Sequence, residues 1–200
     1  MGVRNFLRTL IVLVGVMAFV DVNSQDISPV GLKVGDKAPE VKGINQFGEN
    51  INLKDKLKDG KVVVLFYRGS WCPYCKKQLS DLQDSLNLIS AKGAEIIAVT
   101  PERKEGIKKV QSKLDAGFNI LHDKDLEIMK AYDVDFKLPE KIKKKYLGYG
   151  INLNSINGDN GENLPIPAVY VIGQNGNIEY RYFDEDYTKR LSVSELLEKL

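Results

Sequence analysis

The chain has 200 residues, of which 29 are basic and 27 acidic, and its formal net charge at pH 7 is +2. This near balance excludes the strongly basic surface typical of nucleic-acid-binding domains, so we expect no nucleic-acid partner. The length is enough for one domain with a complete hydrophobic core.

The first 24 residues have the pattern of a secretory signal peptide. Two arginines precede an apolar run of 11 residues from Leu10 to Val20, and a polar segment with small residues follows. This run is shorter than the roughly 20 residues that a membrane-spanning helix needs. We therefore expect cleavage before Gln25, a single domain over residues 25–200, and export to the periplasm, cell envelope or extracellular space without a stable membrane span.

The middle of the chain predicts alternating strands and helices. Lys61–Tyr67 is a continuous apolar run rich in β-branched residues, as in a strand buried on both faces. Leucine and isoleucine residues at helical spacing then predict an amphipathic helix to about Ala91, and Glu95–Val99 is a second apolar run. This order predicts a βαβ unit with parallel strands.

The C-terminal half adds further strands and helices. Phe118–Leu121 predicts a short strand, and a helix is expected to begin at Asp125. The strands expected at Ala168–Ile172 and Asn177–Tyr182 flank an Asn-Gly pair, which is a strong hairpin signal. Ser192 opens a capping box at the start of a final helix. The chain is therefore expected to be an α/β protein with a central mixed sheet flanked by helices.

The chain has two cysteines, Cys72 and Cys75, separated by two residues. A disulfide between them would close a very short loop and restrain little of the unfolded chain. A structural zinc site needs four ligands, so it would have to be shared between two chains. The spacing therefore favours a redox-active dithiol, with an inert disulfide and a shared zinc site as alternatives.

The predicted elements place this dithiol between a buried strand and the start of a helix. Unpaired N–H groups and the helix dipole favour a thiolate on Cys72, which we expect to be exposed. Pro73 suits the first helical turn, and Cys75, one turn later, could attack a mixed disulfide formed at Cys72. Trp71 and Tyr74 would flank the sulfur and offer an apolar surface to a partner.

Four segments resemble the alkyl hydroperoxide reductase and thiol-specific antioxidant family, whose members are peroxiredoxin-like proteins. They are Val34–Pro39, Phe66–Cys75, Leu164–Ile172 and Phe183–Arg190. The resemblance implies a thioredoxin-like fold, with Cys72 as nucleophile and Cys75 as resolving thiol. It also implies that Pro167 is a cis proline facing the sulfurs, and that neither a cofactor nor a metal ion is required.

The sequence departs from this family at positions that matter for peroxide chemistry. Gly69 stands where peroxiredoxins usually have Thr or Ser, so the hydroxyl that binds peroxide is absent unless Ser70 substitutes for it. Thioredoxins commonly bury an acid at the position held here by Phe66. Arg68, four residues before Cys72, is the catalytic candidate that could stabilise a thiolate or a polarised peroxide. Its alternative interpretation is a surface arginine at the end of a strand.

Three functions fit these observations. The first is thiol–disulfide exchange with partner proteins or an external thiol reductant. The second is thiol-dependent reduction of hydrogen peroxide or organic hydroperoxides. The third is a non-catalytic binding module whose dithiol is incidental.

Overall fold

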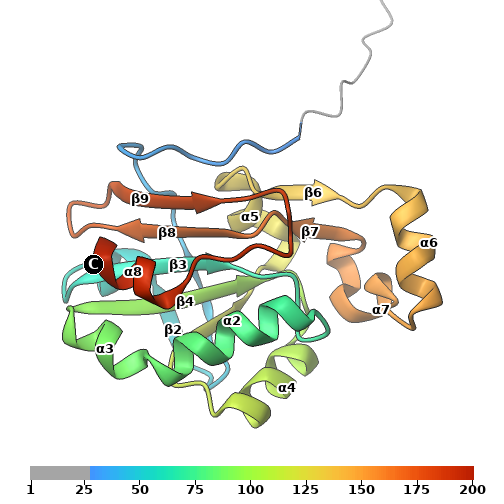
Figure 1. Cartoon of the computed structure of the whole chain (residues 1–200), viewed down its shortest axis with the longest axis horizontal. Helices are drawn as coiled ribbons and strands as arrows, with labels where there is room; N and C mark the ends of the chain where they lie inside the picture. Colours follow the sequence, from blue (N-terminus) through green and yellow to red (C-terminus); the bar gives the residue numbers. More distant parts are fainter. Residues whose placement is uncertain (1–27) are drawn as a thin grey trace, which may run out of the picture.

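A computed structural model describes residues 28–200, so the predicted signal peptide lies outside the described residues. The centre is a five-stranded sheet in the order β5-β4-β3-β8-β9 (Figure 1). Strands β3, β4 and β5 are parallel, whereas β8 runs antiparallel to both β3 and β9. The strand bounds are Lys61–Phe66 (β3), Ala94–Thr100 (β4), Asn119–His122 (β5), Ala168–Ile172 (β8) and Ile178–Phe183 (β9). The predicted βαβ unit, hairpin and mixed sheet are confirmed.

Helices cover both faces of this sheet, which explains the continuous apolar sequence of β3. Val63 and Leu65 belong to a core cluster on one face, and Val62 and Val64 belong to a second cluster on the other. The first cluster includes residues of α2 (Pro73–Asp84), α3 (Leu86–Ala91), α4 (Lys104–Leu114) and α8 (Val193–Lys199). The second includes residues of α1 (Leu53–Lys56) and α5 (Glu127–Ala131).

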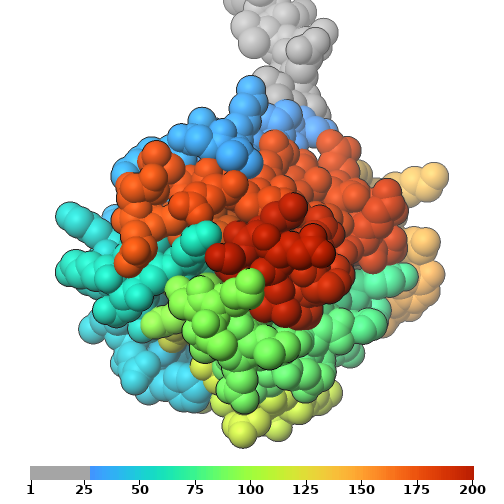
Figure 2. Space-filling view, turned by 60° about the vertical axis from the view of Figure 1, so that its left-hand side comes forward, coloured from blue at the N-terminus to red at the C-terminus, as the bar shows by residue number. Residues whose placement is uncertain are grey.

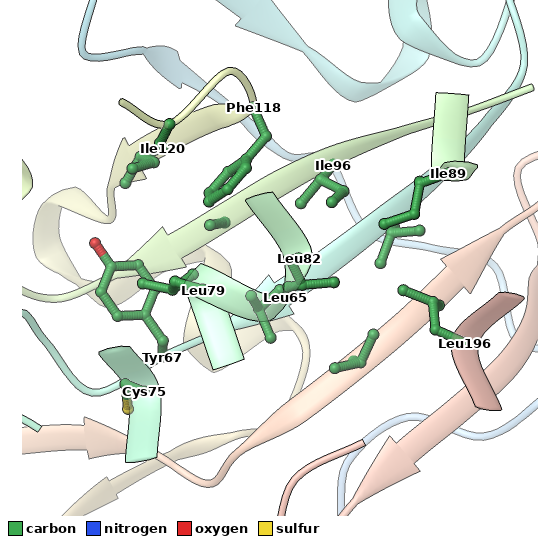
Figure 3. Packing of buried hydrophobic residues seen from close by; sticks show 14 of the residues in the cluster. Leu65, Tyr67, Cys75, Leu79, Leu82, Ile89, Ile96, Phe118, Ile120 and Leu196 are labelled. Atoms are coloured by element: carbon green, nitrogen blue, oxygen red, sulfur yellow. The ribbon is translucent and has the colours of Figure 1, made fainter. Parts of the chain in front are cut away.

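The first cluster connects the C-terminal helix to the cysteine-bearing helix. Leu196 of α8 packs in the same cluster as Ile89 of α3 and Leu79 of α2. Figure 2 shows the C-terminal segment (red) against the β8–β9 hairpin (orange) and the segment around α3 (light green). Cys75 lies at one edge of this cluster, near Tyr67 and Leu79 (Figure 3).

Two local predictions at helix ends have different outcomes. The Ser192 hydroxyl accepts the Glu195 N–H over 3.2 Å, so the predicted cap of α8 is confirmed. The single helix predicted up to Ala91 is wrong, because Ser85 (φ −106°, ψ 8°) leaves the helical conformation between α2 and α3. Serine competes with helical geometry in this way because its side chain favours caps and turns.

Two small antiparallel pairs complete the strands, β1 (Lys42–Ile44) with β2 (Asn50–Asn52) and β6 (Asp135–Lys137) with β7 (Asn163–Pro165). Residues 138–162, here called the β6–β7 excursion, leave β6 and return to β7 beyond one end of the sheet (Figure 1). The excursion contains α6 (Glu140–Gly148), α7 (Leu153–Asn157) and the short helix η2 (Gly158–Asn160), and another short helix, η1 (Lys124–Leu126), precedes α5.

The excursion has its own small core, formed by Leu138, Tyr146, Leu153 and Leu164, and Trp71 packs against it. It therefore reaches the segment that carries the cysteines. Within residues 28–200, the helices are all too short or too polar to cross a bilayer.

Candidate active site

The two cysteines lie where the chain leaves β3 and enters α2. Cys72 is the N-cap residue with an extended backbone (φ −81°, ψ 119°), and Pro73 is the first residue of the helix. A proline costs little at this position because its missing N–H would have no helical partner. The Cys72 carbonyl accepts the Lys76 N–H over 3.0 Å, so Cys75 follows within the first turn.

Both sulfurs are covered, since Cys72 and Cys75 are each 1% exposed. The prediction that Cys72 is exposed is therefore wrong. Aromatic side chains from distant segments fold over this end of α2. Trp71 packs edge-on against Tyr146 of the excursion with ring centroids 5.5 Å apart. These contacts close a site that an isolated strand–helix junction would leave open.

The two thiols are free and differ in acidity. Hydrogen bonds from the side chain and backbone of Cys75, together with the charges of Arg68 and Arg190, lower the pKa of Cys72 to about 6 although burial opposes this. The hydrogen bond to Cys72 and burial raise the pKa of Cys75 well above its ordinary value. At neutral pH the pair is therefore a thiolate on Cys72 and a thiol on Cys75.

Arg68 is 2% exposed, so its interpretation as a surface residue is wrong. Its guanidinium donates to the Tyr146 hydroxyl and lies 4.3 Å from the ring centroid of Tyr187 and 5.1 Å from that of Trp71. Its Nε atom has no hydrogen-bond partner among residues 28–200. The arginine thus joins three separate segments, and its charge acts on the Cys72 thiolate.

Arg190 is a second cation at the site, and the sequence reasoning gave it no role. Its Nη2 donates to Cys75 Sγ over 3.5 Å, and Nη1 donates to the carbonyls of Lys189 and Tyr187. The residue belongs to the loop between β9 and α8. The only signal in the sequence was its place at the end of a segment that resembles the family.

The turn before Cys72 explains why the family's hydroxyl is missing. Gly69 has φ +143°, and a Cβ there would lie 2.5 Å from Trp71 Nε1, so a threonine does not fit. The Ser70 hydroxyl donates to Glu102 Oε1 over 2.7 Å, and the Ser70 N–H donates to Oε2 over 2.6 Å. The hydroxyl proton of Ser70 is therefore already donated to Glu102, so Ser70 does not replace the hydroxyl that is missing at Gly69.

The prediction of a cis peptide bond at Pro167 is wrong, because the bonds within residues 28–200 are all trans. Pro167 links β7 directly to β8, and its carbonyl accepts the Asp184 N–H over 3.3 Å. The trans isomer is favoured by about 0.5–1 kcal/mol when packing does not demand the other. Pro167 therefore lies immediately before β8 as an ordinary trans proline.

A groove lies beside the dithiol. Tyr74 is 43% exposed and packs edge-on against Tyr187, with ring centroids 5.9 Å apart. The groove has a volume of about 320 Å³ and is lined by Tyr74, Lys77, Gln78, Asp81, Leu82, Thr188, Arg190, Leu191, Ser192 and Val193. Tyr74 thus has the exposed position predicted for it, whereas Trp71 is half-buried under the excursion.

Comparisons with known proteins show similarity to thiol-dependent redox proteins. The model of the AhpC/TSA family matches residues 34–181. The chain is 31% identical over 117 residues to peroxiredoxin Bcp of Bacillus subtilis, covering 58% of this chain and 73% of that protein. It is also 31% identical over 134 residues to the thiol-disulfide oxidoreductase ResA of Bacillus subtilis, covering 66% of this chain and 74% of that protein.

A solved structure, that of peroxidoxin BcpB from Mycobacterium tuberculosis, superposes with a TM-score of 0.65 at 16% identity. The superposition covers 84% of this chain and 96% of that one. This likeness shows the thioredoxin-like fold that was predicted.

Proposed function

The chain belongs to the AhpC/TSA family and is a thiol-dependent oxidoreductase, and we propose that its reaction is thiol–disulfide exchange through Cys72 and Cys75. One observation carries the proposal, namely two free thiols within one helical turn, with Cys72 as the N-cap of α2 and Arg190 donating to Cys75 Sγ. The pKa of Cys72, lowered to about 6, supports it. Such a pair provides both the nucleophile and the group that resolves the mixed disulfide.

The proposed reaction has two steps. The Cys72 thiolate attacks one sulfur of a partner disulfide, and the other sulfur leaves as a thiolate. Cys75 then loses its proton and attacks Cys72 Sγ, which releases the second partner sulfur and forms the Cys72–Cys75 disulfide. Two electrons pass to the partner, and the reverse sequence would oxidise it.

The partners proposed for this reaction are proteins or small thiols that bind the groove beside the dithiol. Tyr74 presents an exposed ring there, and Arg190 lines the groove while bonding to Cys75 Sγ. Because both sulfurs are buried, a protein partner requires the segments packed around the start of α2 to move. The contacts of Arg68 with Tyr146 and Tyr187 hold two of these segments together.

Peroxide reduction is the second candidate, and the two arginines favour it. Arg68 and Arg190 both act on the Cys72 sulfur, and a donor aimed at a breaking O–O bond is worth about 2.7–4 kcal/mol. A hydroperoxide is also small enough to reach a covered sulfur with little rearrangement. Against it, Gly69 excludes the family's hydroxyl and Ser70 is bonded to Glu102.

Stopped-flow kinetics of the reduced protein separate these candidates. Oxidation by hydrogen peroxide and by a model disulfide is compared at equal concentrations, with Cys72→Ser as the inactive control. We expect disulfide exchange to be faster. A peroxide rate constant of about 10⁵ M⁻¹s⁻¹ or more would show a peroxidase instead. No turnover of either compound would leave the binding module as the remaining function.

We also propose that the protein acts outside the cytoplasm, on the basis of the basic, apolar and polar order of residues 1–24. N-terminal sequencing of protein recovered from the cell envelope is expected to begin at or near Gln25. Recovery of envelope protein that still begins at Met1 would contradict cleavage.

A further inference from the structure

Glu102 is a buried carboxyl group beside the thiol site that the reaction above does not use. It is 3% exposed and lies between the end of β4 and the start of α4. Its side chain fills space left by two glycines, since a Cβ on Gly106 would lie 1.9 Å from its Cδ and a Cβ on Gly69 3.3 Å from it. Glycine is unfavourable inside a helix such as α4, so the fold accommodates this carboxyl group at a cost.

Both carboxylate oxygens bind the turn that leads to Cys72. Oε2 accepts the Ser70 N–H over 2.6 Å, and Oε1 accepts the Ser70 hydroxyl over 2.7 Å. In the same turn the Gly69 carbonyl accepts the Cys72 N–H over 3.2 Å. The position of Ser70 therefore determines how the chain enters α2.

Glu102 is itself held firmly by its neighbours. Its N–H bonds to Thr100 Oγ1 over 3.2 Å, and its carbonyl contacts His122 Nδ1 at 2.9 Å. The backbone of Glu102 is thus fixed by residues of β4 and β5.

The surroundings of Glu102 act on its pKa in both directions. Burial raises the pKa, whereas the two hydrogen bonds from Ser70 and the charge of Lys109 on α4 lower it. The bonds to Ser70 thus offset part of the cost of burying this carboxylate.

We propose that Glu102 is a positioning residue of the thiol site, whose carboxylate holds the turn before Cys72 through its two hydrogen bonds to Ser70. This inference rests on the proposed thiol chemistry, because it concerns the nucleophile of that reaction. Glu102 acts on Cys72 through Ser70.

The test measures the thiols themselves, so it does not depend on any partner or peroxide. Alkylation of Cys72 and Cys75 by iodoacetamide is followed by mass spectrometry from pH 5 to 10. Glu102→Gln keeps an oxygen for the Ser70 N–H but removes the charge, whereas Glu102→Ala removes both. Glu105→Gln, an exposed neighbour, is the matched control.

One comparison decides the test. With both cysteines present, Glu102→Ala is expected to shift the alkylation profile of Cys72 to higher pH by roughly one unit, because a displaced Cys72 loses hydrogen bonds from Cys75 that lower its pKa. Glu102→Gln, which keeps an acceptor for the Ser70 N–H, is expected to restore most of the wild-type profile, and Glu105→Gln to leave it unchanged.

A wild-type Cys72 profile in Glu102→Ala overturns the proposal, and so does a Glu102→Gln profile shifted as far as that of Glu102→Ala. If Glu102→Ala does not fold, Ser70→Ala replaces it, because it removes one of the two bonds to the turn. A shift of the Cys72 profile to higher pH is then expected again. If these measurements contradict the role of Glu102, the proposal of disulfide exchange still stands. If the expected shifts are found but the protein does not exchange disulfides, only the proposed function is rejected.

Discussion

The Arg190 guanidinium donates a hydrogen bond to Cys75 Sγ over 3.5 Å, although 115 positions separate the two residues in the chain. The loop between β9 and α8 is therefore part of the thiol site. Its cation is one of two that lower the pKa of Cys72, the other being Arg68. Of the two, Arg190 is the simpler to test because Arg68 is also packed among three aromatic rings.

Arg190→Gln is expected to raise the pKa of Cys72, because it removes a positive charge that favours the thiolate. Alkylation of Cys72 at pH 6 should slow by roughly three- to tenfold, as expected for loss of a nearby opposite charge. At pH 9 the rate should approach that of the wild type, since the thiol is then ionised in both proteins. Lys189→Gln is the control, and an Arg190→Gln profile that matches it would contradict the role given to Arg190.

The two cysteines are expected to behave differently when mutated. Cys75→Ser should accumulate mixed disulfides with partners, because Cys72 remains a thiolate and nothing resolves the adduct. Cys72→Ser should accumulate none near neutral pH, because Cys75 is buried and burial alone still raises its pKa when Cys72 is absent. Non-reducing gels and mass spectrometry of the adducts measure this. Faster reaction of Cys75 than of Cys72 at pH 7 would reverse the assignment.

The features that were predictable from the sequence depend on neighbours along the chain. The apolar run of β3, the Asn-Gly hairpin between β8 and β9, and the Ser192 cap each require only a few consecutive residues. They follow from periodicity and turn chemistry. The position of the dithiol at the start of α2 follows from the same local pattern.

The remaining features depend on residues that the fold brings together from afar. Ser70 meets Glu102 across 32 positions, and Arg68 meets Tyr146 across 78. Tyr146 lies in a segment for which the sequence predicted no helix or strand, so nothing indicated that Arg68 would be buried against it. Burial and electrostatic partners of this kind are properties of the packing, and hydrophobic periodicity does not encode them.

Gly69→Thr restores the hydroxyl that related proteins carry, yet it is expected to destabilise the chain. The residue has φ +143°, and its Cβ would meet Trp71 Nε1 at 2.5 Å. Strain and overpacking together should lower the free energy of unfolding by about 2 kcal/mol or more. Urea denaturation measures the loss.

Gly48→Ala is the control, because it introduces backbone strain at a positive φ without a steric clash of the added Cβ. Gly48 has φ +87° but nothing within 4 Å of the added Cβ, so this variant should lose only about 1 kcal/mol. Equal losses in Gly69→Thr and Gly48→Ala would show that Trp71 and Glu102 do not restrict the turn.

Asp123 makes the stability depend on pH. The residue is 1% exposed and accepts the N–H groups of Ile128 and Met129 over 2.9 and 2.7 Å. Burial raises the pKa of Asp123 from 3.8 to about 6. A raised pKa means that the native state favours the protonated acid, so this contribution to stability is complete below pH 3.8 and is lost as the pH rises through about 6.

Asp123→Asn removes this titration. Relative to the wild type, the variant should gain up to about 3 kcal/mol of unfolding free energy between pH 4 and pH 7, at 1.36 kcal/mol per pKa unit. Urea unfolding of both proteins at the two pH values gives the difference, in which other titrating groups cancel. A difference that does not change with pH would contradict the raised pKa.

The β6–β7 excursion is a segment whose sequence and length can vary without a change in the central sheet. It begins and ends at paired strands, and the Leu138 N–H bonds to the Glu162 carbonyl over 3.2 Å, so its ends meet whatever its length. Insertions, deletions and replacements between such ends leave the central sheet undisturbed. Because Tyr146 within it touches both Arg68 and Trp71, changes that move Tyr146 reach the thiol site. Descendants of this chain could therefore diversify in thiol reactivity while inheriting the same scaffold.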